Sequence, residues 1–138
     1  MNLSLMEIRL ILEKSATGYS AYSEDLKGVA TAGDTIEEVK ENFKEVLDLQ
    51  ADYLEEEGNT TQATELRNAK IAYYLDLNTF FEYYSLFNKS ELAKYLGINP
   101  SHLRRLSGTN IELSEKKALQ IQNGLHKLAD DLKQICFA

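Results

Sequence analysis

NKSELAKYLGINPSHLRRLSG, residues 88–108, is the stretch that decides the fold of the second half of this chain. Its apolar residues keep the spacing of a helix face both before and after Gly97. They are Leu92, Ala93 and Leu96 in the first group, and Leu103 and Leu106 in the second. The stretch therefore predicts two short helices, each with one buried face.

The residues between these two groups are suited to a sharp turn. Gly97 can adopt the left-handed conformation that ends many helices, and Ile98 is expected to fill the corner. Asn99 is a favourable N-cap, and Pro100 falls at the first helical position, where its missing N–H does no harm. The spacing predicts a helix-turn-helix motif.

The second helix of this motif carries the residues expected to contact DNA. With its two leucines turned inward, a rotation of about 100° per residue directs Ser101, Arg104 and Arg105 outward, with His102 beside them. Arginine can donate two hydrogen bonds to guanine, and serine can reach a base or a phosphate. The candidate DNA-binding residues are Lys89, Ser101, His102, Arg104, Arg105, Thr109 and Asn110. A helix-turn-helix used only for packing or dimerisation is the alternative.

Two segments of the second half together resemble a known family of helix-turn-helix domains. LAKYLGINPSHLRRLSG followed by LSEKKALQIQNGL resembles the helix-turn-helix of the phage-repressor and Xre family, over about residues 88–132. The resemblance implies sequence-specific DNA binding. The chain departs from the family at Pro100, where glutamine is frequent, so one contact to DNA is expected to be missing.

The charge of the chain is unevenly distributed. Residues 1–77 contain 7 Lys+Arg and 16 Asp+Glu, a net of −9, whereas residues 78–138 contain 8 and 6, a net of +2; together these give the −7 of the whole chain. An acidic segment repels DNA, so we expect nucleic-acid contact in the second half. The acidic half is either a solvated surface or a surface for a basic partner.

Composition also limits the cellular setting. The chain is 43% hydrophobic and 27% charged, which is ordinary for a globular protein. No apolar run approaches the roughly 20 residues of a membrane span, and no signal peptide is recognisable. The single cysteine, Cys136, cannot form an internal disulfide. We therefore expect a cytoplasmic protein without a membrane partner.

Hydrophobic periodicity predicts an α+β first domain, residues 1–77. Alternating residues indicate strands near residues 6–13, 18–23 and 28–33, connected as an antiparallel meander. A helix is expected from Thr35 to Glu57 with Asp34 as its N-cap, followed by a short helix or loop at 60–68 and a fourth strand at 71–77. The inner face of the long helix, from Thr35 to Glu57, is predicted to contain Ile36, Val39, Phe43, Val46, Leu47, Tyr53 and Leu54. The order is β-β-β-α-β, with the helix covering one face of the sheet.

GYSAYSEDLKGVATAGDTIEEVKENFKEVL, residues 18–47, resembles the HicB antitoxin domain. The shared features are an aromatic-small-aromatic strand, an acidic residue and a glycine in the turn, and GDT-x-EE at the start of a long helix. The resemblance covers about residues 5–77 and implies a degraded ribonuclease-H-like fold. It also implies a HicA-like mRNA-cleaving toxin as the partner, and the candidate toxin-binding residues are Tyr19, Tyr22, Glu24 and Asp25.

The second domain, residues 78–138, is predicted to be all-α. The segment TFFEYYSLF, residues 79–87, indicates an aromatic helix whose Phe80, Phe81, Tyr84 and Phe87 form the core. A last helix is expected from Ser114, with apolar residues in heptad spacing. These residues are Ala118, Ile121, Leu125, Leu128, Leu132 and Ile135. Because this stripe is longer than a small helix-turn-helix core needs, we expect part of it to be the interface of a homodimer or a higher homo-oligomer.

The sequence does not favour an enzyme. The carboxylates of the first domain form no recognisable metal set, and His102 and His126 have no Cys or His close in sequence. No phosphate-binding glycine loop is present, so no catalytic residue, metal or cofactor is expected. The predicted function is an antitoxin that neutralises its toxin and represses its own operon by binding a palindrome. The alternative is a transcriptional repressor whose first domain only dimerises or senses a ligand.

Overall fold

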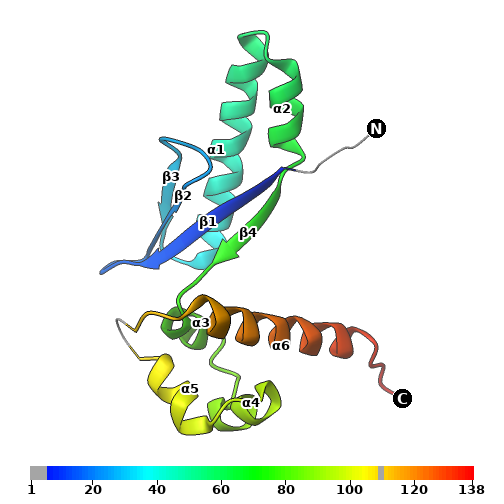
Figure 1. Cartoon of the computed structure of the whole chain (residues 1–138). Helices are drawn as coiled ribbons and strands as arrows, with labels where there is room; N and C mark the ends of the chain where they lie inside the picture. The colour runs from blue at the N-terminus through cyan, green and yellow to red at the C-terminus, as the bar shows by residue number, and fades with distance from the viewer. Residues whose placement is uncertain (1–5, 109–110) are drawn as a thin grey trace. The chain divides into compact units, whose positions relative to one another are not determined.

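The computed structural model describes residues 6–108 and 111–138, which form an α+β protein (Figure 1). Within these residues it has a four-stranded mixed sheet and six helices. The chain divides into two compact units, Met1–Asp76 and Leu77–Ala138, called unit 1 and unit 2 below.

The sheet belongs to unit 1 and has the strand order β3-β2-β1-β4. Its strands are β1 (Glu7–Lys14), β2 (Tyr19–Ser23), β3 (Ala30–Gly33) and β4 (Lys70–Tyr74). The first three pair antiparallel, which confirms the predicted meander. β4 pairs parallel with β1, so the chain must return across the sheet between β3 and β4, as parallel pairing requires.

One face of the sheet is covered by helix α1 (Ile36–Glu56), and helix α2 (Thr60–Arg67) lies beside α1. Alternation along β1 buries its inward residues Ile8, Leu10 and Leu12 almost completely. α1 contributes its own buried stripe of Ile36, Val39, Phe43, Leu47 and Ala51. The Nζ of Lys40 lies 4.4 Å from the centroid of the Tyr73 ring, which links α1 to β4 across this face.

Two expectations for helix α1 are corrected by the structure. The N-cap of α1 is Thr35 rather than Asp34, because the extended Thr35 accepts a 3.1 Å hydrogen bond from the Glu38 N–H. Tyr53 is 56% exposed and does not belong to the inner face. Ala51 takes that place, since it follows Leu47 by four residues and therefore lies on the same side of the helix.

The structure also defines the bounds of the elements that follow α1 in unit 1. The segment for which a helix or a loop was possible is the helix α2, which buries Ala63 and Leu66. The fourth strand ends at Tyr74, earlier than predicted, and Leu77 already begins helix α3.

Unit 2 consists of α3 (Leu77–Tyr83), α4 (Lys89–Leu96), α5 (Pro100–Leu106) and α6 (Glu115–Lys133). All four helices contribute to one hydrophobic core. The buried members of this core are Leu77, Phe81, Leu92, Ala93, Leu96, Ile98, Leu103 and Ile121. Phe80 and Phe87 pack against it as predicted, but Tyr84 is 37% exposed and lies at its margin.

The long helix α6 continues past the part of unit 2 that it packs against. Ser114 is its N-cap, as expected, and its helical conformation ends at Lys133, so that Ile135 lies outside the helix. Of the predicted heptad stripe, Ile121 is buried and Leu125 is partly buried against the core. Leu132 and Ile135 are 57% and 55% exposed. The stripe is therefore divided between a packed first half and an uncovered second half.

Candidate functional site

The candidate DNA-contacting surface is built on the turn between α4 and α5. Gly97 ends α4 with φ 73° and ψ 29°, the left-handed conformation predicted for it. The N–H of Ile98 donates to the Ala93 carbonyl at 2.9 Å, and the Ile98 side chain is only 5% exposed. These contacts fix the direction in which the chain leaves α4.

The start of α5 is held by one side chain. The Oδ1 of Asn99 accepts hydrogen bonds from the N–H groups of Ser101 and His102, at 2.9 and 3.3 Å. Pro100 occupies the first turn, where no N–H is required. Both expectations for this turn are confirmed, and the N-terminal end of α5 is thereby capped in a defined geometry.

The outward face of α5 carries the residues predicted for it. Leu103 is completely buried, whereas Ser101, Arg104 and Arg105 are exposed and His102 is half-buried. The Nε of Arg104 lies 3.5 Å from the Pro100 carbonyl, so its guanidinium runs back along the helix surface. The structure brings one hydroxyl and two guanidinium groups together on one side of a short helix.

Arg105 and His102 contact each other on this face. The Nη2 of Arg105 lies 2.8 Å from the Nδ1 of His102. Because a guanidinium can only donate, this nitrogen of His102 must be the acceptor, and the ring proton then lies on Nε2. His102 therefore orients Arg105 and leaves its own N–H available as a donor.

Lys89, at the first position of α4, is placed differently from the arginines. It is half-buried, and its Nζ lies 5.2 Å from the centroid of the Phe81 ring in α3. The ammonium group of Lys89 thus makes a cation–π contact with this ring, near the N-terminal end of α4. Thr109 and Asn110, also predicted to contact DNA, lie outside the described residues.

Residues that the sequence did not single out support the two short helices from outside. Gln120 Nε2 of α6 donates to the Leu96 carbonyl at 3.2 Å, and Asn78 Nδ2 of α3 donates to the Ser107 carbonyl at 3.0 Å. The last carbonyl groups of α4 and α5 are thus satisfied by side chains of neighbouring helices.

Gly124 allows α6 to approach α4. A Cβ added at this position would overlap the Cδ2 of Leu96. A glycine inside a helical apolar stripe costs up to about 1 kcal/mol relative to alanine, so its presence there is a signal of close packing that the sequence already contained.

The candidate toxin-binding residues of unit 1 are not gathered on one surface. Tyr19 and Tyr22 are three residues apart on β2 and therefore lie on opposite faces of the sheet. Tyr22 lies on the face away from the helices, opposite Ile11. Desolvation raises the pKa of its phenol, and the neighbouring Glu13 adds to the rise. Glu24 is exposed in the turn that follows β2.

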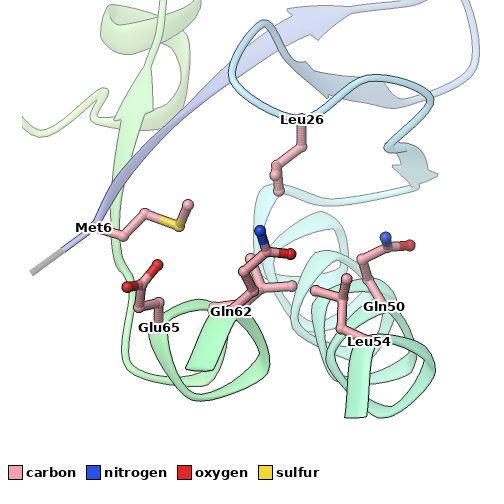
Figure 2. A pocket seen from close by; sticks show the side chains of 7 residues that line it. Met6, Leu26, Gln50, Leu54, Gln62 and Glu65 are labelled. Atoms are coloured by element: carbon pink, nitrogen blue, oxygen red, sulfur yellow. The ribbon is translucent and has the colours of Figure 1, made fainter. Parts of the chain in front are cut away.

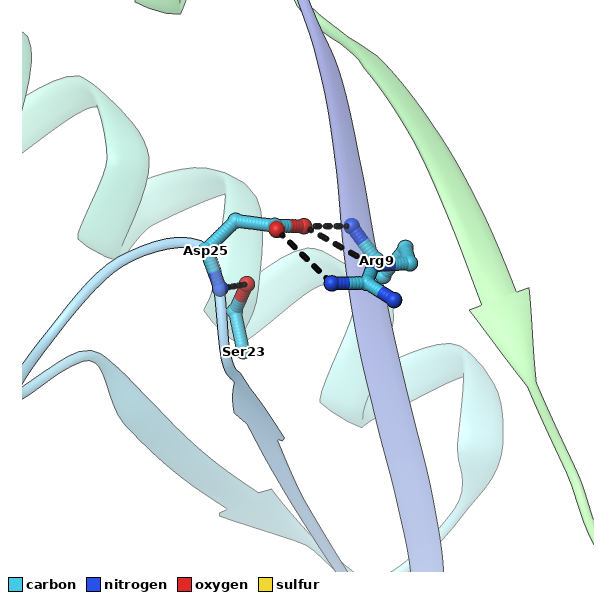
Figure 3. A network of polar contacts seen from close by, with 3 residues as sticks. All are labelled: Arg9, Ser23 and Asp25. Carbon is cyan, nitrogen blue, oxygen red and sulfur yellow. Dashed lines mark hydrogen bonds and ion pairs between the residues drawn. The ribbon is translucent and has the colours of Figure 1, made fainter.

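Asp25 is engaged within unit 1 (Figure 3). Its carboxylate accepts from the backbone N–H of Arg9 at 2.8 Å and forms an ion pair with the Arg9 guanidinium at 3.2 Å. The Asp25 N–H donates to Ser23 Oγ at 3.1 Å. Hydrogen bonds from Arg9 hold the pKa of this carboxyl below its ordinary value and raise the pKa of the guanidinium. The geometry gives Asp25 a structural role at the end of the β1–β2 pair.

Within residues 6–108 and 111–138, no group of three or more His, Cys, Asp or Glu side chains is placed to hold a metal ion. In the same part of the chain, no helix is long and apolar enough to cross a membrane. No protein-family model matches this chain, and no curated protein matches it.

Proposed function

We propose that this chain is an antitoxin that binds operator DNA through unit 2 and a HicA-like toxin through unit 1. The observation that carries the proposal is the outer face of α5, where Ser101, Arg104 and Arg105 are exposed over the completely buried Leu103. In this proposal α4 and α5 are the two helices of a helix-turn-helix, and α5 is the helix that enters the major groove.

Several features support DNA reading by α5. Arginine donates two hydrogen bonds to guanine in the major groove, and the contact with His102 restricts the conformations of Arg105 before DNA is bound. A side chain that is already oriented loses less conformational entropy on binding. Lys89 is positioned to contact a phosphate, which would add affinity without sequence preference.

A symmetric dimer is part of this proposal. The uncovered second half of the α6 stripe, with Leu132 and Ile135 more than half exposed, offers an apolar surface to a second copy. Two copies related by a twofold axis present two recognition helices, which suits a palindromic operator with half-sites about one helical turn, ~34 Å, apart.

The toxin-binding role is supported by the order of elements and the charge of unit 1. Three antiparallel strands, a helical segment and a fourth strand beside β1 agree with the element order expected of a degraded ribonuclease-H-like HicB domain. The net charge of −9 over residues 1–77 favours a basic protein over nucleic acid as the partner of this unit.

The proposal is tested by two binding measurements on the intact chain. Gel shifts should detect specific binding to the DNA upstream of its gene, with affinity falling steeply as salt rises. A small gene for a HicA-like basic protein is expected beside it, and co-expression of the two should give a stable complex at low salt. If the chain binds DNA but forms no such complex, its function is the alternative one, a transcriptional repressor without a toxin partner. If it neither binds DNA nor forms the complex, the proposal is refuted.

A further inference from the structure

A cavity opens in unit 1 beyond the end of the sheet (Figure 2). Its volume is about 290 Å³, and its apolar walls are formed by Met6, Leu26, Leu54 and Leu66. These residues come from the position just before β1, the β2–β3 loop, α1 and α2. A cavity of this size and composition has room for an apolar side chain of another molecule.

The apolar surface continues from this cavity onto the outer side of α1. Gln50 lines the cavity, and Tyr53 follows it by three residues, so the two are surface neighbours on the helix. Tyr53 is 56% exposed, and Leu49, one turn before it, is 70% exposed. Two large apolar side chains thus stand next to an apolar cavity. We call the cavity together with Leu49 and Tyr53 the α1–α2 surface.

Carboxylates surround the α1–α2 surface. Glu45 and Glu56 are exposed on α1, one turn from Leu49 and Tyr53 respectively, and form no ion pair within the described part of the chain. Asp52 and Glu55, in contrast, both bind Arg67 of α2, at 2.8 and 2.7 Å. One group of carboxylates is therefore neutralised internally, and another remains available around the exposed leucine and tyrosine.

We propose that the α1–α2 surface is where unit 1 binds its basic protein partner, which inserts an apolar side chain into the cavity. This inference rests on the proposed toxin-binding function and names the surface that performs it. Apolar anchors in pockets carry most of the binding energy at protein interfaces, and surrounding charges set orientation and association rate.

The negative charge around the α1–α2 surface favours a basic protein over other partners. A second copy meeting the same surface across a twofold axis would bring the carboxylates of Glu45 and Glu56 of both copies into one interface, which is repulsive. DNA, RNA and anionic lipid would be repelled for the same reason. A basic protein with an exposed apolar side chain satisfies both the cavity and the carboxylates.

The experiment measures the affinity of the intact chain for the purified HicA-like protein that the proposed function expects to be encoded beside it. Leu49→Ala combined with Tyr53→Ala should raise the Kd at least tenfold, because both side chains are lost from the interface. Gln62→Trp should have a similar effect by filling the cavity, since Gln62 lines it and is exposed. Each variant should keep the circular-dichroism spectrum and thermal unfolding of the parent, which shows that unit 1 is folded.

Tyr22→Ala combined with Tyr74→Ala is the control for the competing surface, the open face of the sheet, which carries Tyr22 as a candidate toxin-binding residue; these tyrosines are 37% and 47% exposed. It removes a comparable apolar area and should leave the Kd within about twofold. If the control weakens binding and the α1 variant does not, the open sheet face is the interface and the inference is overturned. If the parent itself does not bind, the proposed toxin-binding function fails, and the inference fails with it.

Discussion

The carboxylate of Asp25 accepts a hydrogen bond from the backbone N–H of Arg9 at 2.8 Å and also pairs with the guanidinium of the same residue. The last β1–β2 pair is Leu10 with Ser23, so Asp25 provides the next acceptor after β2 has ended. The Asp25 side chain thereby adds one more hydrogen bond to those that join β1 and β2.

This pairing predicts a specific pH dependence. The folded state holds the pKa of Asp25 below its ordinary value near 3.8. A depressed folded-state pKa gives stability that is complete above the ordinary value and is lost as pH falls through the folded pKa. The difference in unfolding free energy between the parent and Asp25→Asn should thus stay constant above about pH 5 and shrink below pH 4. Urea titrations between pH 3 and 7 measure it, and a difference independent of pH would contradict the role of this ion pair.

Arg105 should contribute sequence preference. Arg105→Ala is expected to weaken operator binding by roughly 1–3 kcal/mol and to relax the preference at one base pair. Arg105→Lys keeps the charge but loses the two-pronged donor, so it should lose specificity while keeping the salt dependence. Fluorescence anisotropy with operator and scrambled DNA separates these effects. Equal binding of the parent and both variants to the operator would exclude α5 as the reading helix.

Lys89 should contribute affinity without preference. Its position at the start of α4 suits a phosphate contact, so Lys89→Ala should weaken operator and scrambled DNA alike. The slope of log K against log salt should become shallower by about one unit. Because the Nζ also lies over the Phe81 ring, thermal denaturation is needed to confirm that unit 2 remains folded. A selective loss of operator binding would instead place Lys89 near a base.

Leu132 should support dimerisation. Because it is 57% exposed, Leu132→Asp should not disturb the core of unit 2, but a dimer interface would bury the new charge at a cost of several kcal/mol. Sedimentation should therefore show a folded monomer. Leu119→Asp is the matched control, since Leu119 is 47% exposed and lies roughly on the opposite side of α6. A folded dimer of the Leu132 variant would place the interface elsewhere.

Gly97 should be required for its conformation rather than for its small size. A Cβ at this position would meet nothing within 4 Å, but φ is +73°. Gly97→Ala should cost about 1–2 kcal/mol, the price of the left-handed region, whereas Gly97→Asn should cost less. Chemical denaturation measures both. Equal stability of the alanine variant and the parent would show that the turn can rearrange.

The parts of the fold that the sequence predicted are set by neighbouring residues. The turn at Gly97, the cap at Asn99 and the proline after it each depend on interactions within about four residues, and all three have the expected geometry. The meander was predictable for the same reason, because short connections leave few alternative pairings.

The parts of the fold that the sequence did not predict depend on contacts between residues that are distant in the sequence. The parallel pairing of β4 with β1 joins residues about 60 positions apart, and alternation within β4 says nothing about its neighbour. The bond from Asp25 to Arg9 spans 16 residues, so that aspartate looked available for a partner. Tyr53 was assigned to the inner face of α1 because apolar character alone does not distinguish a core residue from an exposed one.

The caps that α3 and α6 place on the ends of α5 and α4 also bear on when the proposed DNA-reading surface can form during synthesis. Helices of seven and eight residues are too short to persist alone in water. Gln120 and Gly124, which hold the end of α4, leave the ribosome only after α5 has been completed. A nascent or prematurely terminated chain that ends at Gly108 therefore contains every residue of α5 but lacks the α6 contacts that hold the end of α4. The proposed DNA-reading face should form only when α6 has been made.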